Sequence, residues 1–241
     1  MSSRRKLAII GMGKMGRVLE QLAPERGWDV VARIGSASNR DGAGVTPTSL
    51  NGADAAIEFT LPNAAVANVR AAVAARTPIV VGTTGWLSEL PALSEWVTQH
   101  KGALLTAANF SLGVNAFEQI VALASRLLST AGGFDAHLVE THHAAKKDAP
   151  SGTAGMLHDA ASRAWPREIP ITSIRTGSVP GTHELVFDAP FETVTLAHVA
   201  RDRRVFAEGA LVAAAWLIGR TGMFTMRDVI GAGAHAGAGD S

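Results

Sequence analysis

Short apolar runs alternate with longer helical patterns through the first half of this chain. Such alternation is typical of a parallel sheet buried between helices, because each pair of parallel strands needs a crossover that covers one face. We expect strands at residues 6–10, 29–34, 55–59, 79–81 and 103–106, and helices at 14–26, 63–75 and 88–100. Ser88 is the expected N-cap of the last of these helices. The pattern predicts an α/β fold.

The pattern changes near residue 108, where we place a domain boundary. A core helix is expected at 115–128, and its apolar face carries Phe117, Ile120, Val121, Ala124 and Leu128. An extended stretch at 135–141, a helix at 153–164 and β-like runs at 169–175, 184–187 and 193–198 follow. Because these runs lie close together, we expect them to pair in antiparallel fashion. The second half is thus expected to form a mixed α+β domain.

The composition limits the possible functions. The chain has 241 residues, 47% hydrophobic and 18% charged, enough for one or two modest domains. Its 22 basic and 21 acidic residues give a net charge of +1, which argues against general nucleic-acid binding. Cysteine is absent, which excludes disulfides, thiolate nucleophiles and Cys-ligated metal centres. Redox chemistry would therefore need a bound cofactor.

The amino terminus lacks the pattern of a secretory signal. Residues 1–6 run directly into the short apolar stretch 7–10 and then glycine, without a longer apolar region or a small-residue cleavage site. No uncharged run approaches the roughly eighteen residues of a membrane span. We expect a cytoplasmic protein without a membrane partner.

A glycine-rich turn follows the first strand and directly precedes a helix. Its residues are Gly11, Met12, Gly13, Lys14, Met15 and Gly16. In a dinucleotide site the first glycine permits the tight turn, the second lets the backbone approach a pyrophosphate, and the third lets the helix pack on the sheet. The helix N-terminus then supplies N–H groups and positive partial charge. A glycine-rich turn also occurs without a ligand, but this strand–turn–helix context predicts a Rossmann-like dinucleotide-binding domain.

The end of the second strand bears on the choice of cofactor. NAD-selective enzymes usually carry an acid there for the ribose 2′-hydroxyl, yet no Asp or Glu lies between Asp29 and Asp41. Arg33 or Arg40, with hydroxyls such as that of Ser36, would suit a 2′-phosphate instead. We expect NADPH to be preferred, with NADH possible. The alternative is that these are ordinary polar loop residues and that both cofactors are used.

Two further loops leave the carboxyl ends of expected strands, where ligands bind in open α/β sheets. Both are rich in small residues, which admit a flat ligand close to the backbone. Each of them would, taken alone, equally fit a simple turn. The candidate cofactor-binding residues in these loops are Gly82, Thr83 and Thr84, and Ala108, Asn109 and Phe110.

Most of the titratable chemistry lies in segment 140–153. In an extended stretch Glu140 and His142 point to one face, and imidazole transfers protons near neutral pH. Lys146 and Lys147 are cationic donors. Backbone N–H groups just before a helix form a cradle suited to a carboxylate; here they belong to Ser151, Gly152 and Thr153.

Three other interpretations of this segment need to be weighed. Ser151 or Thr153 would cap the following helix in any case. A metal site from His137, Glu140, His142 and His143 is disfavoured, because His137 and His143 face away from the other two and the nearby lysines repel a cation; we predict no metal. A serine hydrolase is excluded by the lack of a Gly-x-Ser-x-Gly elbow.

The run Glu140, His142, His143, Lys146 and Asp148-Ala-Pro-Ser-Gly-Thr-Ala154 closely resembles the signature of the 4-hydroxy-tetrahydrodipicolinate reductase (dihydrodipicolinate reductase) family of bacterial lysine and diaminopimelate biosynthesis. The resemblance covers nearly the whole chain in the family's order. Other segments that carry it are 11–17, 58–60, 82–85, 109–115, 175–177, His198, 203–210 and 222–228. The histidine–lysine to Ser-Gly-Thr run is highly specific, whereas the glycine loop is shared with many unrelated enzymes.

The resemblance implies a dinucleotide-binding domain at 1–108, a substrate-binding and oligomerisation domain at 109–207, and a carboxy-terminal return to the first domain at 208–241. It implies a homotetramer and a small dicarboxylate substrate. On the family's pattern His142 is the proton donor, and Lys146 also has a catalytic role. Substrate-binding residues fall on His143, Lys146, Ser151, Gly152 and Thr153, and Phe59 joins the cofactor residues. One departure is Gly35, where many members have an acid.

The implied reaction is a hydride transfer from nicotinamide C4 to the ring after water is lost, with a proton added at the neighbouring carbon. Two alternatives stay open at this point. One is another NAD(P)-dependent dehydrogenase of a small dicarboxylate, such as an aspartate dehydrogenase. The other is a non-catalytic nucleotide-sensing module, which would be expected to lose the polar cluster at 140–153.

Overall fold

The computed structural model describes residues 4–40 and 42–235, the side chains of 232–235 excepted. The chain divides into two compact units. Unit 1 comprises Met1–Ser111 and Arg204–Ser241, and unit 2 comprises Leu112–Arg203. From the sequence we expected boundaries after residues 108 and 207, whereas the two units meet after residues 111 and 203.

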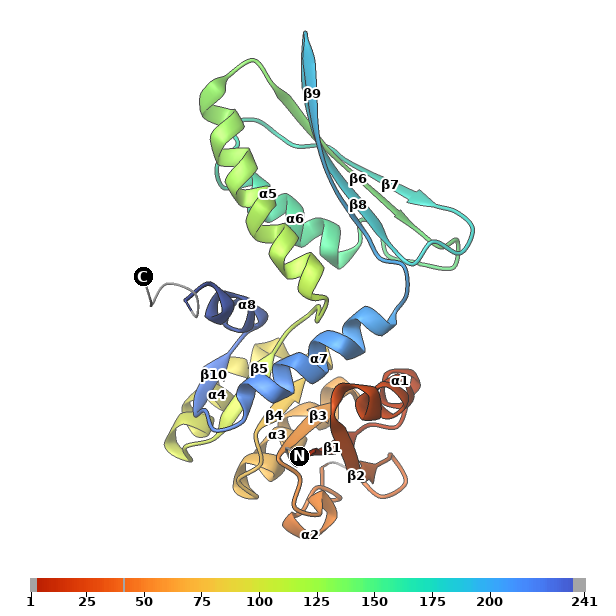
Figure 1. Cartoon of the computed structure of the whole chain (residues 1–241), viewed down its shortest axis with the longest axis vertical. Coiled ribbons are helices and arrows are strands. Elements are labelled where there is room, and N and C mark those ends of the chain that lie inside the picture. Colours follow the sequence, from red (N-terminus) through yellow and green to blue (C-terminus); the bar gives the residue numbers. More distant parts are fainter. Residues whose placement is uncertain (1–3, 41, 236–241) are drawn as a thin grey trace. The chain divides into compact units, whose positions relative to one another are not determined.

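Unit 1 is built on a parallel sheet (Figure 1). Its strands follow the order β10-β5-β4-β3-β1-β2. They are β1 (Arg5–Ile10), β2 (Trp28–Ile34), β3 (Ala55–Glu58), β4 (Ile79–Val81), β5 (Ala103–Thr106) and β10 (Gly222–Phe224). The five strands expected from the sequence are confirmed, while β10 was not anticipated. Because the chain passes from β1 first to β2 and then to β3 on the other side, the Rossmann-type switch point lies at the carboxyl end of β1.

Three helices of unit 1 were expected from the sequence and are present with local differences: α1 (Lys14–Leu22), α3 (Pro62–Ala74) and α4 (Leu90–Gln99). The helices α2 (Pro47–Leu50), α7 (Arg204–Leu217) and α8 (Met226–His235) were not expected. The expected helix 14–26 ends its α-helical part at Leu22 and continues as a 3₁₀ turn, Ala23–Arg26, because Pro24 cannot continue the α-helical hydrogen bonding. The N-cap prediction for Ser88 is wrong: it lies inside the 3₁₀ turn Leu87–Glu89, and α4 begins at Leu90 with Pro91 in its first turn.

Unit 2 has a four-stranded sheet in the order β7-β6-β8-β9. Its elements are α5 (Leu112–Ala131), β6 (Asp135–His142), α6 (Gly152–Ser162), β7 (Ile171–Arg175), β8 (Thr182–Ala189) and β9 (Glu192–Val199). β8 pairs with β6 and β9 in antiparallel fashion, as expected. β7 does not: it lies parallel to β6, because α6 forms a crossover between them.

The core of unit 2 lies between this sheet and the helices α5 and α6, which cover the same face of it (Figure 1). Phe117 and Val121 of α5 are buried there, as expected. Ile120 is not, since half of it is exposed on the opposite face of α5. In the part of the chain that the structure describes, no helix has the length and apolar character needed to cross a membrane.

Candidate active site

The glycine loop lies at the switch point, between β1 and α1. Gly11 has φ +99°, and a Cβ there would lie 2.0 Å from the backbone oxygen of Phe59. A Cβ on Gly16 would lie 2.0 Å from the oxygen of Gly11. Gly13, the N-cap of α1, makes no side-chain cap hydrogen bond, and apart from its own chain neighbours and helix backbone no atom of the described residues lies within 4 Å of its Cβ position. The first turn of α1 therefore faces open space, which suits a pyrophosphate held by backbone N–H groups.

The ends of β3, β4 and β5 come together beside this loop. The rings of Phe59 and Phe110 meet edge to face, with centroids 5.9 Å apart. Gly82 lies against Phe59, since a Cβ at Gly82 would be 2.0 Å from the ring. Thr83 is buried, and its Oγ1 accepts a hydrogen bond from the N–H of Thr60 over 2.7 Å. The structure thus brings together candidate cofactor residues from three separate loops.

The loop after β2 offers exposed polar groups, but Arg33 is already engaged. Its Nε donates to Glu20 Oε1 of α1 over 2.5 Å, and a second nitrogen donates to the carbonyl of Val30. Ser36 and Arg40 are exposed. A Cβ on Gly35 would have Met12 Cβ as its nearest atom, 4.0 Å away, so a side chain fits there without a clash.

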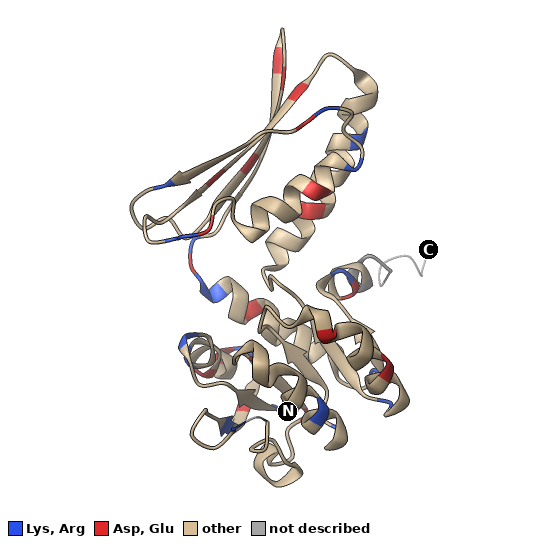
Figure 2. Cartoon of the chain, turned by 180° about the vertical axis from the view of Figure 1, so that it is seen from behind, with Lys and Arg blue, Asp and Glu red and all other residues tan. Residues whose placement is uncertain are grey.

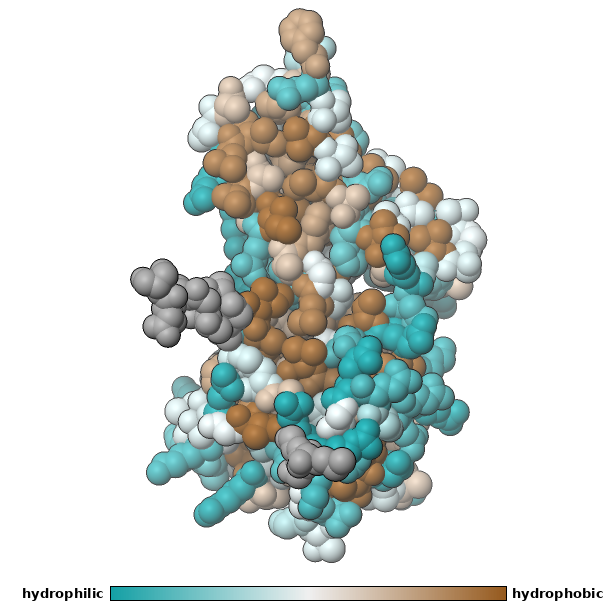
Figure 3. Space-filling view, viewed as in Figure 1, coloured by the Kyte–Doolittle hydropathy of each residue, from teal (hydrophilic) through white to brown (hydrophobic). Residues whose placement is uncertain are grey.

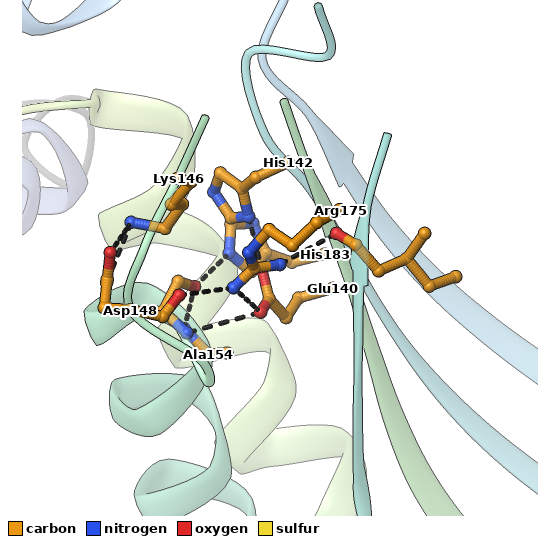
Figure 4. Close-up of polar contacts among 9 residues, drawn as sticks. Glu140, His142, Lys146, Asp148, Ala154, Arg175 and His183 are labelled. Atoms are coloured by element: carbon orange, nitrogen blue, oxygen red, sulfur yellow. Dashed lines mark hydrogen bonds and ion pairs between the residues drawn. The ribbon is translucent and has the colours of Figure 1, made fainter. Parts of the chain in front are cut away.

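In unit 2, a buried acid–base cluster lies on the inner face of the sheet (Figure 4). His142 and Glu140 are two residues apart on β6, and Nδ1 of His142 contacts Oε2 of Glu140 in a short hydrogen bond. Oε1 of Glu140 accepts from Arg175 Nη2 of β7 over 2.6 Å. The expectation that Glu140 and His142 share a face is therefore confirmed. Nδ1 is occupied by the carboxylate, which leaves Nε2 as the imidazole atom available for proton transfer.

The electrostatics of this cluster follow from burial and from its hydrogen bonds. Burial opposes the charged form of Glu140, but hydrogen bonds from Arg175, Ser173 and His142 outweigh it and lower its pKa to about 2. Burial lowers the pKa of His142, and the hydrogen bond and charge of Glu140 offset part of that effect. Burial, helped by the positive charge of His142, lowers the pKa of His183 to about 4. Glu140 is thus ionised and His183 neutral at neutral pH.

The start of α6 borders the same cluster. Ser151 caps the helix, its Oγ accepting from the N–H of Ala154 over 3.1 Å, and the same oxygen lies 3.2 Å from Nε2 of His183. No atom lies within 4 Å of the Cβ position of Gly152. Thr153 follows within the first turn of α6, at intermediate exposure. Ser151 therefore acts as the cap, and the helix N-terminus also keeps an approachable backbone.

The lysine and second histidine of the segment lie on the loop after β6. Lys146 Nζ donates to both carboxylate oxygens of Asp148, each over 2.8 Å (Figure 4). The side chain of Lys146 is mostly buried, whereas the carboxylate of Asp148 is exposed. His143 is half-buried, and its backbone N–H donates to the carbonyl of Val179. A substrate carboxylate can replace Asp148 as the partner of Lys146 without leaving the ammonium unpaired.

The geometry of the cluster bears on metal binding. Ligand atoms of Glu140, His142 and His183 lie within 4.8 Å of one another. Both oxygens of Glu140 are, however, already bonded, one to Arg175 and one to His142, and the guanidinium would repel a cation. The arrangement favours proton transfer over metal coordination.

Two family models match the chain in succession. The amino-terminal domain of dihydrodipicolinate reductase matches residues 5–110, and the carboxy-terminal domain matches residues 113–230. The chain belongs to the dihydrodipicolinate reductase family. The resemblance inferred from segment 140–154 is therefore confirmed.

Similar proteins agree with this membership. The 4-hydroxy-tetrahydrodipicolinate reductase of Christiangramia forsetii is 33% identical over 93% of this chain and 97% of its own length. That of Methanoregula boonei is 39% identical over 74% of this chain and 75% of its own length. Among solved structures, the dipicolinate-bound dihydrodipicolinate reductase of Paenisporosarcina sp. TG-14 has a TM-score of 0.75 at 20% identity, covering 92% of this chain and 97% of that one, which shows a shared fold.

Two members of the acid–base cluster were not among the residues singled out from the sequence for a site. Arg175 and His183 lie 35 and 43 residues after Glu140, on β7 and β8. One signal for His183 was available: in strand 182–189, the inward positions are His183, Leu185 and Phe187, and only the first is polar. For Arg175 the only signal in the sequence was the resemblance of segment 175–177 to the family, because its contact with Glu140 depends on the parallel pairing of β6 and β7.

Proposed function

We propose that this chain catalyses the NAD(P)H-dependent reduction of 4-hydroxy-tetrahydrodipicolinate to tetrahydrodipicolinate, in which the 4-hydroxyl group leaves as water before the ring accepts a hydride and a proton; the reaction is a step of lysine and diaminopimelate biosynthesis. The observation that carries the proposal is the buried Glu140–His142 pair beside Lys146 and the start of α6, in a chain whose two units both match the family. In this proposal unit 1 binds the dinucleotide and unit 2 binds the substrate.

The residues of unit 1 suit a nicotinamide dinucleotide. The open N-terminus of α1 at Gly13 would hold the pyrophosphate. The loop containing Gly82, Thr83 and Thr84 and the segment Ala108, Asn109 and Phe110 would hold the nicotinamide end, with Phe59 packed beneath. When bound, the reduced cofactor supplies a hydride to the ring of the substrate.

His142 supplies the proton that must follow. Glu140 fixes the imidazole through Nδ1 and stabilises its positive charge, so that the acidic proton is held on Nε2. Burial lowers the pKa of His142, which makes the imidazolium a stronger acid toward a carbanion-like ring carbon. Arg175 keeps Glu140 ionised and in place. General acid catalysis of this kind contributes about 10²–10⁴ in rate.

The two carboxylates of the substrate need cationic and N–H donors. Lys146 provides an ammonium, and the backbone of Gly152 and Thr153 provides N–H groups at the positive end of α6. The N–H of Ser151, which the sequence also suggested for this role, instead donates to Glu140 Oε1 over 3.4 Å. His143, on the loop beside them, is a further donor. These groups would orient the ring with its reacting carbon toward His142.

Turnover of purified protein tests this function directly. We expect oxidation of NADPH, followed by its absorbance, only when 4-hydroxy-tetrahydrodipicolinate is present. His142→Gln should lower kcat at least about a hundredfold while the Kd of NADPH stays within about twofold, because the acid acts only at the ring. Oxidation of NADPH with another dicarboxylate, but not with this one, would contradict the proposal.

We further propose that NADPH is preferred over NADH. Gly35 stands at the position where an acidic residue would hydrogen-bond the free ribose 2′-hydroxyl of NADH, and Ser36 and Arg40 are exposed on the same loop. The pairing of Arg33 with Glu20 makes Arg40 the stronger candidate for the 2′-phosphate. A charge-assisted contact of about 1.5 kcal/mol is worth roughly a tenfold preference.

We propose that the chain acts in the cytoplasm as a homotetramer. Few residues in the strands of the unit 2 sheet are Lys or Arg (Figure 2), and the sheet exposes 41% of Ile174 and 59% of Val199. Apolar side chains also gather along α5 (Figure 3). Association would remove these surfaces from water. Light scattering should give four times the mass of one chain, and Ile174→Lys should lower it; a monomeric wild type would contradict the proposal.

A further inference from the structure

A chain of buried polar side chains runs through unit 1 apart from the residues used so far. Its centre is Glu58, the last residue of β3, which is completely buried. Glu58 Oε1 accepts hydrogen bonds from Asn68 Nδ2 of α3 over 3.2 Å and from the hydroxyl of Thr60. Its other oxygen, Oε2, is buried and has no partner among the residues that the structure describes. A buried carboxyl group at this place needs an explanation beyond packing.

Asn68 connects this carboxyl group to the loop that follows β2. It is completely buried, and its Oδ1 accepts from Asn39 Nδ2 over 2.8 Å. Asn39 Oδ1 in turn accepts from the N–H of Gly44 over 2.9 Å. The loop is closed tightly there, since a Cβ on Gly44 would lie 2.0 Å from the carbonyl oxygen of Ser38.

The direction of these hydrogen bonds is fixed at the buried end. Asn68 Nδ2 donates to Glu58 and to Thr60 Oγ1, both acceptors, so the carbonyl oxygen of Asn68 must face Asn39. That choice turns the amide nitrogen of Asn39 inward and its oxygen toward Gly44. The orientation of one buried amide therefore determines which way the side chain of Asn39 is turned and that its oxygen faces the N–H of Gly44.

We propose that Glu58 and Asn68 are positioning residues that hold residues 35–40, on the loop after β2, in the shape that selects the 2′-phosphate of the cofactor. The inference rests on the proposed function, because this loop carries Ser36 and Arg40. Neither Glu58 nor Asn68 needs to touch the cofactor: they act through Asn39.

The chemistry of Glu58 makes the proposal specific. Burial raises its pKa, against the opposing hydrogen bonds from Thr60, Thr83 and Asn68. The hydrogen bonds from Asn68 and Thr60 end on Oε1, which accepts them as the carbonyl oxygen of a carboxamide would, so Gln can replace Glu58 while a hydrocarbon cannot. Glu58→Gln should therefore preserve the conformation of the loop after β2, and Glu58→Leu should disrupt it.

The test measures binding of NADPH and NADH by calorimetry, together with the fragments 2′,5′-ADP and 5′-AMP, which report on the adenosine end alone. Asn68→Ala and Asn39→Ala should raise the Kd of NADPH and of 2′,5′-ADP about tenfold while the Kd of NADH and of 5′-AMP changes less than about threefold. Glu58→Leu should change the Kd values as Asn68→Ala does, and Glu58→Gln should keep the wild-type ratio of the Kd of NADPH to that of NADH.

Controls separate positioning from general loss of structure. Asn63→Ala removes an exposed carboxamide from the same helix and should leave every Kd unchanged. Asn39 is only half-buried, so its variant keeps the test valid even where Asn68→Ala fails to fold. The inference would be overturned if Asn39→Ala left the ratio of the Kd of NADPH to the Kd of NADH unchanged, including the case in which both cofactors bind more weakly by the same factor. A wild type that binds neither dinucleotide would overturn the proposed function itself.

Discussion

Two glycines of the same loop should respond in opposite ways to alanine. A Cβ on Gly11 would lie 2.0 Å from a backbone oxygen, and its φ of +99° is unfavourable for alanine. The conformational penalty of about 1–2 kcal/mol and the overpacking penalty of about 1–3 kcal/mol together predict that Gly11→Ala lowers the free energy of unfolding by about 2 to 5 kcal/mol. For a chain of this size that corresponds to a fall in Tm of roughly 4 to 20 °C.

Gly13→Ala should instead spare the fold and impair binding. Its φ of −76° and ψ of −157° suit alanine, and no atom lies within 4 Å of the new Cβ. The smaller entropy of the unfolded chain, about 0.4–1 kcal/mol, offsets a poorer N-cap, so Tm should hardly move. The methyl group occupies the space proposed for the pyrophosphate. Losing one charge-assisted bond of about 1.5–3 kcal/mol raises the Kd of NADPH by about 10- to 150-fold.

Thermal unfolding without ligand and calorimetric titration with NADPH measure the two effects separately. The expected result is a low Tm for Gly11→Ala and a normal Tm with weak binding for Gly13→Ala. An unchanged Kd in Gly13→Ala would refute the assignment of the open space before α1 to the pyrophosphate. A lower Tm for Gly13→Ala than for Gly11→Ala would refute the steric argument.

Three further substitutions probe the substrate and cofactor sites. Lys146→Ala should raise the KM of the substrate by about 10- to 150-fold, as expected for loss of a charge-assisted bond, while Lys147→Ala, at an exposed neighbour, should leave steady-state kinetics unchanged. Gly35→Glu should reverse the NADPH to NADH ratio of kcat/KM, and an unmoved ratio would show that this loop does not contact the 2′-position. The carboxylate of Glu140 raises the pKa of His142, so Glu140→Gln should shift the fall of kcat/KM with rising pH to lower pH. Because the pKa of Glu140 falls from 4.5 to about 2 on folding, it stabilises the protein above pH 4.5, and urea unfolding should show this stability lost between pH 4.5 and 2 in the wild type but not in Glu140→Gln.

The sequence was informative where a local pattern decides the structure. Strands such as 79–81 are buried on both sides and appear as continuous apolar runs, and the shared face of Glu140 and His142 follows from the period of two. Pairing between strands, in contrast, depends on the path of the chain that connects them. The β-like run ending at Arg175 lies close to the next run in sequence, yet it pairs with β6 because the crossover through α6 returns it there.

The polar network in unit 1 illustrates the same limit. Asn39 lies on the loop after β2, Glu58 on β3 and Asn68 on α3, and no local pattern in the sequence indicates that the three are connected. Their significance comes from burial and from the direction of the hydrogen bonds between them. Such information exists only once α3 is packed on the sheet.

The parallel pairing of β6 and β7 affects how the acid–base cluster can assemble during folding and how it could be transferred to another protein. Glu140, His142, Ser151 and Arg175 all belong to one continuous β–α–β segment, residues 135–175. Contacts within one continuous segment cost less loop-closure entropy than contacts between distant ones, so these four residues can come together before β8 adds His183. The same segment is a natural unit for transplantation: grafted whole onto a related scaffold, it would carry the proton donor, its carboxylate, the guanidinium and the helix N-terminus together.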